Sequence, residues 1–412
     1  MRLASETISA RRLGQWSVIA LGASIPISTA LDNVLLVLVV GCFLVSAMSS
    51  RKLSLVNSNP VISAAIILFT LLALGTLYGH GNFAEAAKVL MKYVDLLLVP
   101  VFAFFFFDRS ARRHALYALA ASLALTVMLS FSLAGGILVR PEFFVYDPLH
   151  AVPFKFTLTH TIFVSFGAFL FIQFAANSTS SKARWFWAAL AGLAIVNIFF
   201  VVSGRTGVVV LGALILYCGY ARWGWAGMIR TLMLLMLFSI IAHSIPGVFQ
   251  DRINQAIYEY SSWAPATLAK EGDSIGTRLE FYRNTLAIVR EHPVFGVGTG
   301  GFPAAYAAQV QGSNMPATQN PHNEYLLIAS QIGLVGLVAL LYLFCQQWRL
   351  APRLALPLER HLARGLVIMI SIGCLFNSML LDHAEGLFFA WLTGLLFSEL
   401  GSVSNQDPVR TE

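Results

Sequence analysis

Charged residues are scarce in this sequence. Of its 412 residues, 11% are charged and 57% are hydrophobic, and the mean hydropathy is +0.73. Soluble domains carry about 25% charged residues, so the composition excludes a soluble globular surface. Apolar runs of roughly 17–25 residues recur along the chain, which is the length that a bilayer-spanning helix needs. The sequence therefore predicts an all-α polytopic membrane protein.

Two further absences narrow the class. The short alternating segments of an outer-membrane barrel are missing, since the runs 35–45 and 101–107 are apolar on every face. None of the four cysteines belongs to a C-x-x-C pair, so the sequence indicates neither a disulfide framework nor a zinc site. Walker A, H-E-x-x-H and paired-carboxylate metal motifs are also lacking. We therefore predict no bound metal ion and no cofactor.

About twelve membrane-spanning helices are expected from the apolar runs. The predicted ranges are 15–30, 33–49, 60–79, 90–107, 114–136, 157–176, 184–202, 206–221, 229–246, 322–347, 362–381 and 385–400. The first of them follows two arginines, as in a signal sequence, but no cleavage site comes after it. We expect it to be retained as the first helix.

The distribution of basic residues predicts the orientation. With the N-terminus inside, the short inner loops hold thirteen lysines and arginines and the short outer loops hold five. Cations gather in cytoplasmic loops, which explains the net charge of +7 without nucleic acid as a partner, and both termini are predicted to be cytoplasmic. The inner cations are Arg51, Lys52, Arg109, Arg112, Arg113, Lys182, Arg184, Arg222, Arg230, Arg349, Arg353, Arg360 and Arg364, and the outer ones are Lys88, Lys92, Arg140, Lys155 and Arg205.

One predicted connection is far longer than the others, and loops of such length are usually functional. The chain is thus divided into helices 1–9 in residues 1–246, an outer loop in 247–321, helices 10–12 in 322–400, and a disordered tail in 401–412. Within the outer loop, apolar residues at helical spacing after a capping-box pattern at Thr277–Glu280 predict an amphipathic helix over about 277–291.

A glycine-rich segment, Gly296–Gly301, follows the predicted loop helix. Its glycines match G-x-G-x-x-G, the pattern of a dinucleotide site. The strand and helix that such a site requires are missing around it. A tight turn is therefore predicted here.

Arg205 lies between two predicted spans that almost no loop separates. An arginine close to hydrocarbon is costly unless it snorkels to the interface or meets an anion. Snorkelling is the ordinary explanation, but cations are disfavoured on the outer side, and Gly204 and Gly207 let another group approach closely. The position favours an anion-binding role.

Arg278 falls in the first turn of the predicted loop helix, where a cation opposes the helix dipole. Local stability therefore does not explain it. It borders the apolar stripe of Leu279 and Tyr282, from which it could face the membrane domain. A solvated surface arginine is the alternative, and that description suits Arg283 and Arg290 better.

His322 follows Pro321, a residue suited to the first turn of a helix, so we expect a helix to begin here with His322 at its outer end. An imidazole near the positive helix N-terminus favours its neutral form, which can accept a proton as a general base. Asn323 and Glu324 are nearby polar groups that could help orient it. Most histidines in a membrane bundle are interior hydrogen-bonding residues, as expected for His160 and His243.

Asp382, His383 and Glu385 form a polar cluster in the last outer loop. Asp382 could orient His322 or hold a substrate hydroxyl, although an ordinary polar turn is the simpler explanation. Lys88, which is outside and close to a predicted span, is a weaker candidate for anion binding.

These candidates combine two arginines, a helix-end histidine and a carboxylate on the outer face. Arginines bind phosphate through paired hydrogen bonds. A lipid that carries a pyrophosphate would suit a cleft facing the bilayer, where fixed arginines could stabilise the departing pyrophosphate in place of a metal ion. With a base to deprotonate an attacking hydroxyl, the pattern indicates an anionic lipid substrate and is compatible with a transferase.

The chain resembles the bacterial O-antigen ligase and polymerase family. The elements that carry the resemblance are Ser203–Gly207 (SGRTG), Arg278 in the loop helix, His292–Phe302 (HPVFGVGTGGF), and Pro321–Leu326 (PHNEYL) ahead of Gly333 and Gly336. The P-H-N-x-Y-L element before a G-x-x-G helix is the most specific of them. The number of spans and the late outer loop also agree, so the resemblance covers most of the chain.

The resemblance implies a fold like that of the membrane-embedded C-type glycosyltransferases, placed in the bacterial inner membrane with the active site facing the periplasm. It implies an undecaprenyl-pyrophosphate-linked glycan as donor and, for a ligase, a sugar hydroxyl of lipid A–core as acceptor. Arg205 and Arg278 would hold the pyrophosphate, and His322 would activate the acceptor. Attack opposite the leaving group would invert the anomeric carbon, and no metal is implied.

An O-antigen ligase is the leading hypothesis. An O-antigen polymerase or a protein O-oligosaccharyltransferase would use the same donor, although the latter usually carries a larger C-terminal soluble region. A transporter or flippase is the non-enzymatic alternative. Transporters tend to show repeats and broken helices near the midplane, whereas the polar candidates here gather at the outer end.

Overall fold

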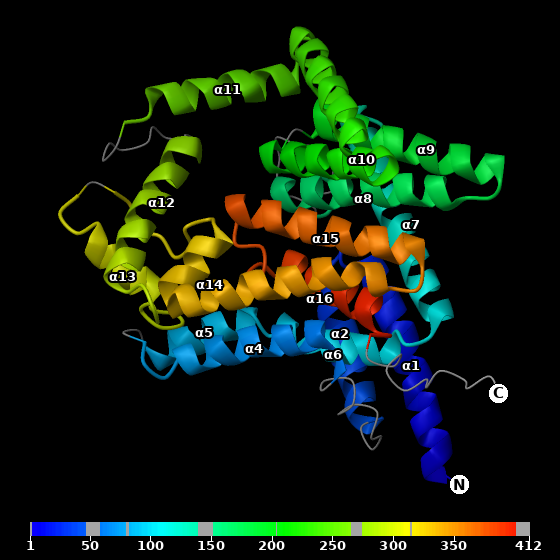
Figure 1. Ribbon diagram of the computed structural model, residues 1–412, viewed down its shortest axis with the longest axis horizontal. Coiled ribbons are helices and arrows are strands. Elements are labelled where there is room, and N and C mark those ends of the chain that lie inside the picture. The colour runs from blue at the N-terminus through cyan, green and yellow to red at the C-terminus, as the bar shows by residue number, and fades with distance from the viewer. Residues whose placement is uncertain are drawn as a thin grey trace, which may run out of the picture.

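The computed structural model describes residues 2–46, 58–79, 82–138, 151–202, 204–264, 274–313 and 315–400. Every regular element in these ranges is helical, which confirms the predicted all-α class (Figure 1). Three of the counted cations, one motif residue and the predicted tail lie outside the described residues. They are Arg51, Lys52, Arg140, Ser203 and residues 401–412.

Among the described residues, five helical stretches are long and apolar enough to cross a membrane. They are Arg109–Ala134 (α7), Thr157–Asn177 (α8), Ser181–Val201 (α9, Ser181–Val196, with the π-helix η2, Asn197–Val201), Arg205–Ser244 (α10) and Glu324–Arg353 (α14, Glu324–Leu350, with the 3-10 turn η3, Ala351–Arg353). The other bundle helices are α1 (Arg2–Ser24), α2 (Thr29–Val45), α4 (Pro60–Gly75), α15 (Pro357–Phe376) and α16 (His383–Phe397). The figure of about twelve spans stays a prediction.

The predicted span 90–107 is two helices, α5 (Phe83–Lys92) and α6 (Asp95–Phe105). The chain breaks at Tyr93, which is fully buried, and its hydroxyl donates a 2.7 Å hydrogen bond to the Glu324 carboxylate. α5 alternates charged and apolar residues around its circumference, so only α6 has the all-round apolar surface of a membrane helix.

α10 contains the predicted span 206–221 and most of the predicted span 229–246, since it ends at Ser244. Between these two spans, Trp223 and Gly224 have non-helical backbone angles. Gly224 takes φ +63°, a backbone conformation that residues with a side chain rarely adopt. Figure 1 shows the second half of α10 turned away from the first.

α16 is almost completely buried, as expected for a helix that is apolar on every face. Trp391 is 0% exposed, and its indole N–H donates to the Val18 carbonyl of α1 at 2.8 Å. Gly394 lets α6 approach, because a Cβ at this position would stand 2.6 Å from the Cβ of Phe102. The core of the bundle therefore forms around α16.

α14 is interrupted at Gly333, which takes φ +68°. The interruption frees two carbonyls of α14, which accept hydrogen bonds from the N–H groups of Val297 and Gly298 at 2.8 Å each. A Cβ on Gly333 would collide with the carbonyl oxygen of Val294. The glycine-rich segment is thus the predicted tight turn, and it holds the outer loop against α14.

The described part of residues 247–321 contains three helices: α11 (Val248–Ser262), α12 (Ser274–Glu291) and α13 (Phe302–Gln309). α12 spans the range of the predicted amphipathic helix, but its described residues are already helical from Ser274, so the predicted capping box at Thr277 is wrong. Thr277 lies inside the helix, and Glu280 accepts a hydrogen bond from the Trp263 indole across the loop. All three helices lie at the end of the bundle where α14 begins (Figure 1).

Candidate functional site

His322 lies in the turn before α14, and the prediction that the helix begins at Pro321 is wrong. α14 begins at Glu324, because Asn323 is its N-cap residue and accepts a 3.0 Å hydrogen bond from the Leu326 N–H. In the described part of the chain, His322 is the one non-glycine residue with positive φ, at +56°. Asn323 therefore has a capping role, and the left-handed turn before it directs the imidazole out of the helix.

Contacts from α12 hold this unusual turn. The Tyr282 hydroxyl donates to the His322 carbonyl at 3.1 Å, and the Phe281 ring stacks on the imidazole with centroids 6.2 Å apart and planes at 23°. On the other side, the His322 N–H donates to Asn320 Oδ1 at 2.8 Å. A left-handed non-glycine residue costs about 1–2 kcal/mol and persists only where its surroundings impose it.

Asn377 links His322 to Asp382. The Nδ1 atom of His322 lies 3.1 Å from Asn377 Oδ1, and Asn377 Nδ2 donates to Asp382 Oδ2. An ionised carboxylate only accepts hydrogen bonds, so the amide must turn its NH₂ group toward Asp382 and its oxygen toward His322. That oxygen requires a hydrogen on Nδ1, which leaves Nε2 of the neutral imidazole with its lone pair. The relay prepares Nε2 as a proton acceptor.

Asp382 is therefore linked to His322 through Asn377, a residue that the sequence analysis did not single out. Asn377 follows α15 and lies near the end of the predicted span 362–381, where polar residues are ordinary, so no local signal marks it. Glu324 points elsewhere: it is 0% exposed, and its carboxylate accepts hydrogen bonds from Tyr93 and from the Leu380 N–H at 2.9 Å. These bonds fasten the Asn377–Asp382 turn to the start of α14.

Two lysines on α5 differ in their surroundings. Lys88, the predicted candidate, is exposed and forms no ion pair within the described residues. Lys92, one turn later, lies near Asp382. Burial raises the pKa of Asp382, and the Asn377 hydrogen bond and the positive charge of Lys92 oppose that shift. Of the two lysines, Lys92 is the one whose charge acts on Asp382.

Arg205, the first residue of α10, is bound by the outer loop. Its NH1 and NH2 groups donate to the two carboxylate oxygens of Glu259 at 2.8 and 3.1 Å, and NH1 also donates to Ser274 Oγ at 3.0 Å. The side chain stays 29% exposed. The two glycines that flank Arg205 pack against Thr161 of α8, so the close approach that they permit serves helix packing.

Glu259 was not among the predicted site residues, since it is one of several charges in a surface loop. It is only 4% exposed, and it also accepts the Ile275 N–H of the first turn of α12 at 3.1 Å. Burial by itself would raise the pKa of Glu259, but the hydrogen bonds and charge of Arg205 outweigh it and lower that pKa. A carboxylate thus occupies an anion position made by a guanidinium and a helix N-terminus.

Arg278 lies on the face of α12 that also carries Phe281 and Tyr282, three and four residues further along. Its guanidinium is partly buried and forms no hydrogen bond or ion pair within the described residues. Burial lowers the pKa of Arg278. The interactions of Arg278 with Tyr282 and Glu259 oppose this shift, whereas the charge of Arg205 adds to it. The fold therefore brings the two arginines close enough to repel each other, which an anion between them would relieve.

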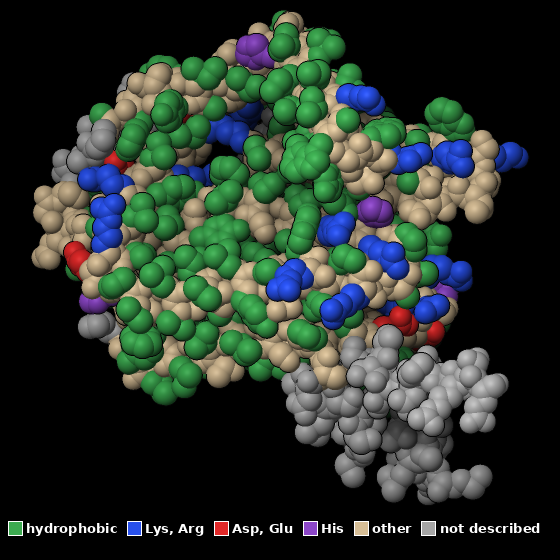
Figure 2. Space-filling view, viewed as in Figure 1, with side chains coloured by type: hydrophobic (Ala, Val, Ile, Leu, Met, Phe, Trp, Pro, Cys, Tyr) green, Lys and Arg blue, Asp and Glu red, His purple; other side chains and the backbone are tan. Residues whose placement is uncertain are grey.

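Figure 2 shows a hollow beneath α11, between α10 and α12, with Lys or Arg side chains at its floor. Arg205 and Arg278 belong to the helices that frame it, and α12 also contacts the His322 turn. The arrangement can hold a phosphate-like anion beside a proton acceptor. Within the described residues, no group of three or more His, Cys, Asp or Glu side chains is placed to hold a metal ion.

A family model described as O-Antigen ligase matches residues 189–341. The matched region contains Arg205, Arg278 and His322, whereas Lys88 and Asp382 lie outside it. An uncharacterised protein of Haemophilus influenzae is 26% identical over 146 residues, which cover 29% of this chain and 36% of that relative's length. A chain from a solved peptidoglycan synthase complex is similar with a TM-score of 0.46 and 17% identity, over 84% of this chain and 98% of that one.

Proposed function

We propose that this chain is an O-antigen ligase of the bacterial inner membrane, and the match of residues 189–341 to a family model described as O-Antigen ligase supports this. It transfers a glycan from an undecaprenyl-pyrophosphate carrier to a sugar hydroxyl of lipid A–core on the periplasmic side. The observation that supports this most directly is the convergence of Arg205, Arg278 and the His322 turn around one helix, α12.

In the proposed mechanism, the arginines hold the donor pyrophosphate and His322 accepts the proton of the acceptor hydroxyl through Nε2. The hydroxyl oxygen attacks the anomeric carbon as the bond to the pyrophosphate breaks, and the pyrophosphate leaves with the electron pair. The guanidinium groups stabilise the charge that develops on it. Attack from the side opposite the leaving group inverts the anomeric carbon, and no metal ion takes part.

α12 supplies the geometric control that this reaction needs. It carries Arg278 and grips the His322 turn through Phe281 and Tyr282, so one rigid element sets the distance between the anion site and the base. When the imidazole takes up a proton, the Nδ1–H bond to Asn377 keeps the ring in place. The charge of Asp382 behind the amide stabilises the imidazolium that forms.

Asp382→Asn tests the relay. An amide at position 382 can donate as well as accept, so the orientation of Asn377 and the tautomer of His322 are no longer imposed. We expect kcat to fall about tenfold, with the KM for the lipid-linked donor unchanged. Transfer assays with purified enzyme and donor would measure this, and an unchanged kcat would show that the relay is only structural.

Glu259→Gln tests whether the Glu259 carboxylate competes with the donor pyrophosphate for Arg205. The donor pyrophosphate must displace a carboxylate that already fills the arginine fork, so removing that charge should lower the donor KM about three- to tenfold. Titration of the lipid-linked donor measures the effect. Glu291→Gln, the same change at an exposed position of α12, is the control. A higher donor KM in Glu259→Gln would mean that Glu259 orients Arg205 for the donor.

The function itself is tested by deleting the gene in the source bacterium and profiling its lipopolysaccharide. A ligase deletion leaves the core without O-antigen while lipid-linked polymer accumulates. A core that carries a single repeat unit would overturn the ligase proposal in favour of a polymerase, which uses the same donor. Unchanged lipopolysaccharide would contradict both.

A further inference from the structure

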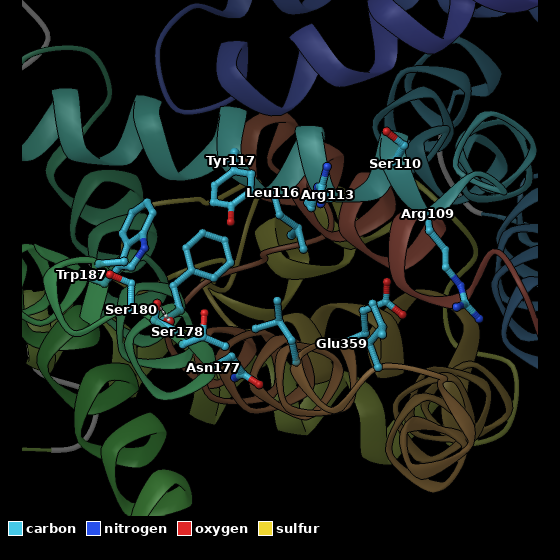
Figure 3. Close-up of a pocket in the computed structure, with 15 residues that line it drawn as sticks. Arg109, Ser110, Arg113, Leu116, Tyr117, Asn177, Ser178, Ser180, Trp187 and Glu359 are labelled. Carbon is cyan, nitrogen blue, oxygen red and sulfur yellow. Dashed lines mark hydrogen bonds between the residues drawn. The ribbon is translucent and has the colours of Figure 1, made fainter. Parts of the chain in front are cut away.

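A cavity of about 620 Å³ lies at the end of the bundle opposite the His322 turn (Figure 3). The start of α7, the α8–α9 connection and the start of α15 form its walls. The 27 residues of α14 separate the two ends by roughly 40 Å, so the cavity is distinct from the candidate catalytic site. Its volume lies in the range of about 300–1,000 Å³ that is typical of ligand pockets.

One wall of the cavity is aromatic. Tyr117 of α7, Phe174 of α8 and Trp187 of α9 contact one another with ring centroids between 4.9 and 6.2 Å apart. Tyr117 in this wall and the neighbouring Trp185 are 48% and 73% exposed. Exposed tryptophan and tyrosine mark the headgroup layer of a bilayer, which places the mouth of the cavity at that level.

The rest of the lining is basic and polar. Arg113 is exposed and forms no ion pair or hydrogen bond within the described residues, and the nearest carboxylate oxygen to Arg109 is that of Glu399, at 3.5 Å. In Figure 3, Arg113 on α7 lies across the hollow from Asn177 and Ser178 at the end of α8. Guanidinium groups beside hydroxyl and amide groups are the donors that a phosphate oxygen accepts from.

Among the lining residues, Glu359 is the one carboxylate, and it does not neutralise the positive charge of Arg113. Arg112 donates to it at 2.8 Å, with both side chains at most 4% exposed, so the two neutralise each other. Glu399 is shared between Arg109 and Arg112, at 3.5 and 3.0 Å. Arg109 and Arg112 are thus paired with these two carboxylates, whereas Arg113 forms no ion pair within the described residues.

We propose that this cavity binds the phosphate headgroup of an anionic glycerophospholipid, with Arg113 on the phosphate and the Tyr117–Phe174–Trp187 wall against the glycerol and acyl chains. The lining, which is partly basic and partly aromatic, favours a phospholipid over a free phosphate ion. A free phosphate ion would leave the aromatic wall uncovered, whereas an amphiphile matches both halves of the cavity and reaches it from the adjoining headgroup layer.

The test is native mass spectrometry of the full-length protein with equal amounts of phosphatidylglycerol and phosphatidylcholine of identical acyl chains. We expect the wild type to retain phosphatidylglycerol about fivefold over phosphatidylcholine, and Arg113→Ala to lose that preference. Arg113→Lys should keep most of it, which separates the loss of charge from misfolding. Arg353→Ala, at the same end but outside the lining, is the control and should behave as the wild type.

A second variant tests the apolar half of the cavity. Trp187→Ala should lower the retention of both lipids while the preference for phosphatidylglycerol persists. Equal retention of the two lipids by the wild type, or an unchanged preference in Arg113→Ala, would overturn the proposal. Displacement of phosphatidylglycerol by inorganic phosphate at equal concentration would also overturn it, by assigning the cavity to a soluble anion.

Discussion

Replacement of His322 by alanine is expected to lower the rate of glycan transfer about 10²- to 10⁴-fold, the usual contribution of a general base. The imidazole has Nδ1 engaged by Asn377 and Nε2 without a hydrogen bond inside the described part of the chain, so Nε2 is the one atom positioned to take the acceptor proton. The measurement is transfer from lipid-linked donor to lipid A–core by purified variants at equal amounts in the membrane. The loss should appear in kcat.

His292→Ala is the matched control for this experiment. It changes the same residue type in the same outer loop, at an exposed position at the end of α12, and should leave transfer within about twofold of the wild type. A normally inserted His322→Ala protein with near wild-type transfer would remove His322 from the catalytic role. Equal losses in both variants would mean that folding of the loop, and not proton transfer, was disturbed.

Replacement of Arg278 by alanine is expected to reduce kcat about 10²- to 10³-fold, the usual effect of removing one donor that stabilises transition-state charge. Arg278 forms no hydrogen bond or ion pair within the described residues, so its removal leaves no described partner unsatisfied. Arg205 is a less clean target, because it ties α10 to α11 and α12 through Glu259 and Ser274. Transfer assays across a range of donor concentrations would separate kcat from KM.

Two variants sharpen the Arg278 experiment. Arg278→Lys keeps the charge but loses the planar fork, so it should recover only part of the activity. Arg283→Ala is the control, because Arg283 lies on the same helix and pairs with Glu280 at 3.0 Å, on a different face from Arg278. Full activity in Arg278→Ala would exclude its role at the pyrophosphate, and full activity in Arg278→Lys would show that charge alone suffices.

Local patterns in the sequence were enough to predict an all-α membrane protein and a helix in the range of α12. The spacing of apolar residues predicted α12, because side chains three and four positions apart share a helix face whatever the surrounding fold. The glycine-rich segment was recognised as a turn because the βαβ context of a dinucleotide site was missing. The start of α14 was misplaced because both Pro321 and Asn323 suit a helix start, and only the observed 3.0 Å cap on Leu326 decides between them.

Arg205, Arg278 and His322 could be singled out from the sequence because each residue type is unusual at its predicted position. Arg205 is a cation on the predicted outer side, Arg278 is a cation in a helix turn where it is unfavourable, and His322 is an imidazole at a predicted membrane boundary. Only the tertiary structure brought them to one end of the bundle. It also supplied Asn377 and Glu259, whose roles depend on hydrogen bonds to residues 55 and 54 positions away. Such contacts are set by the packing of whole helices, so no local sequence pattern records them.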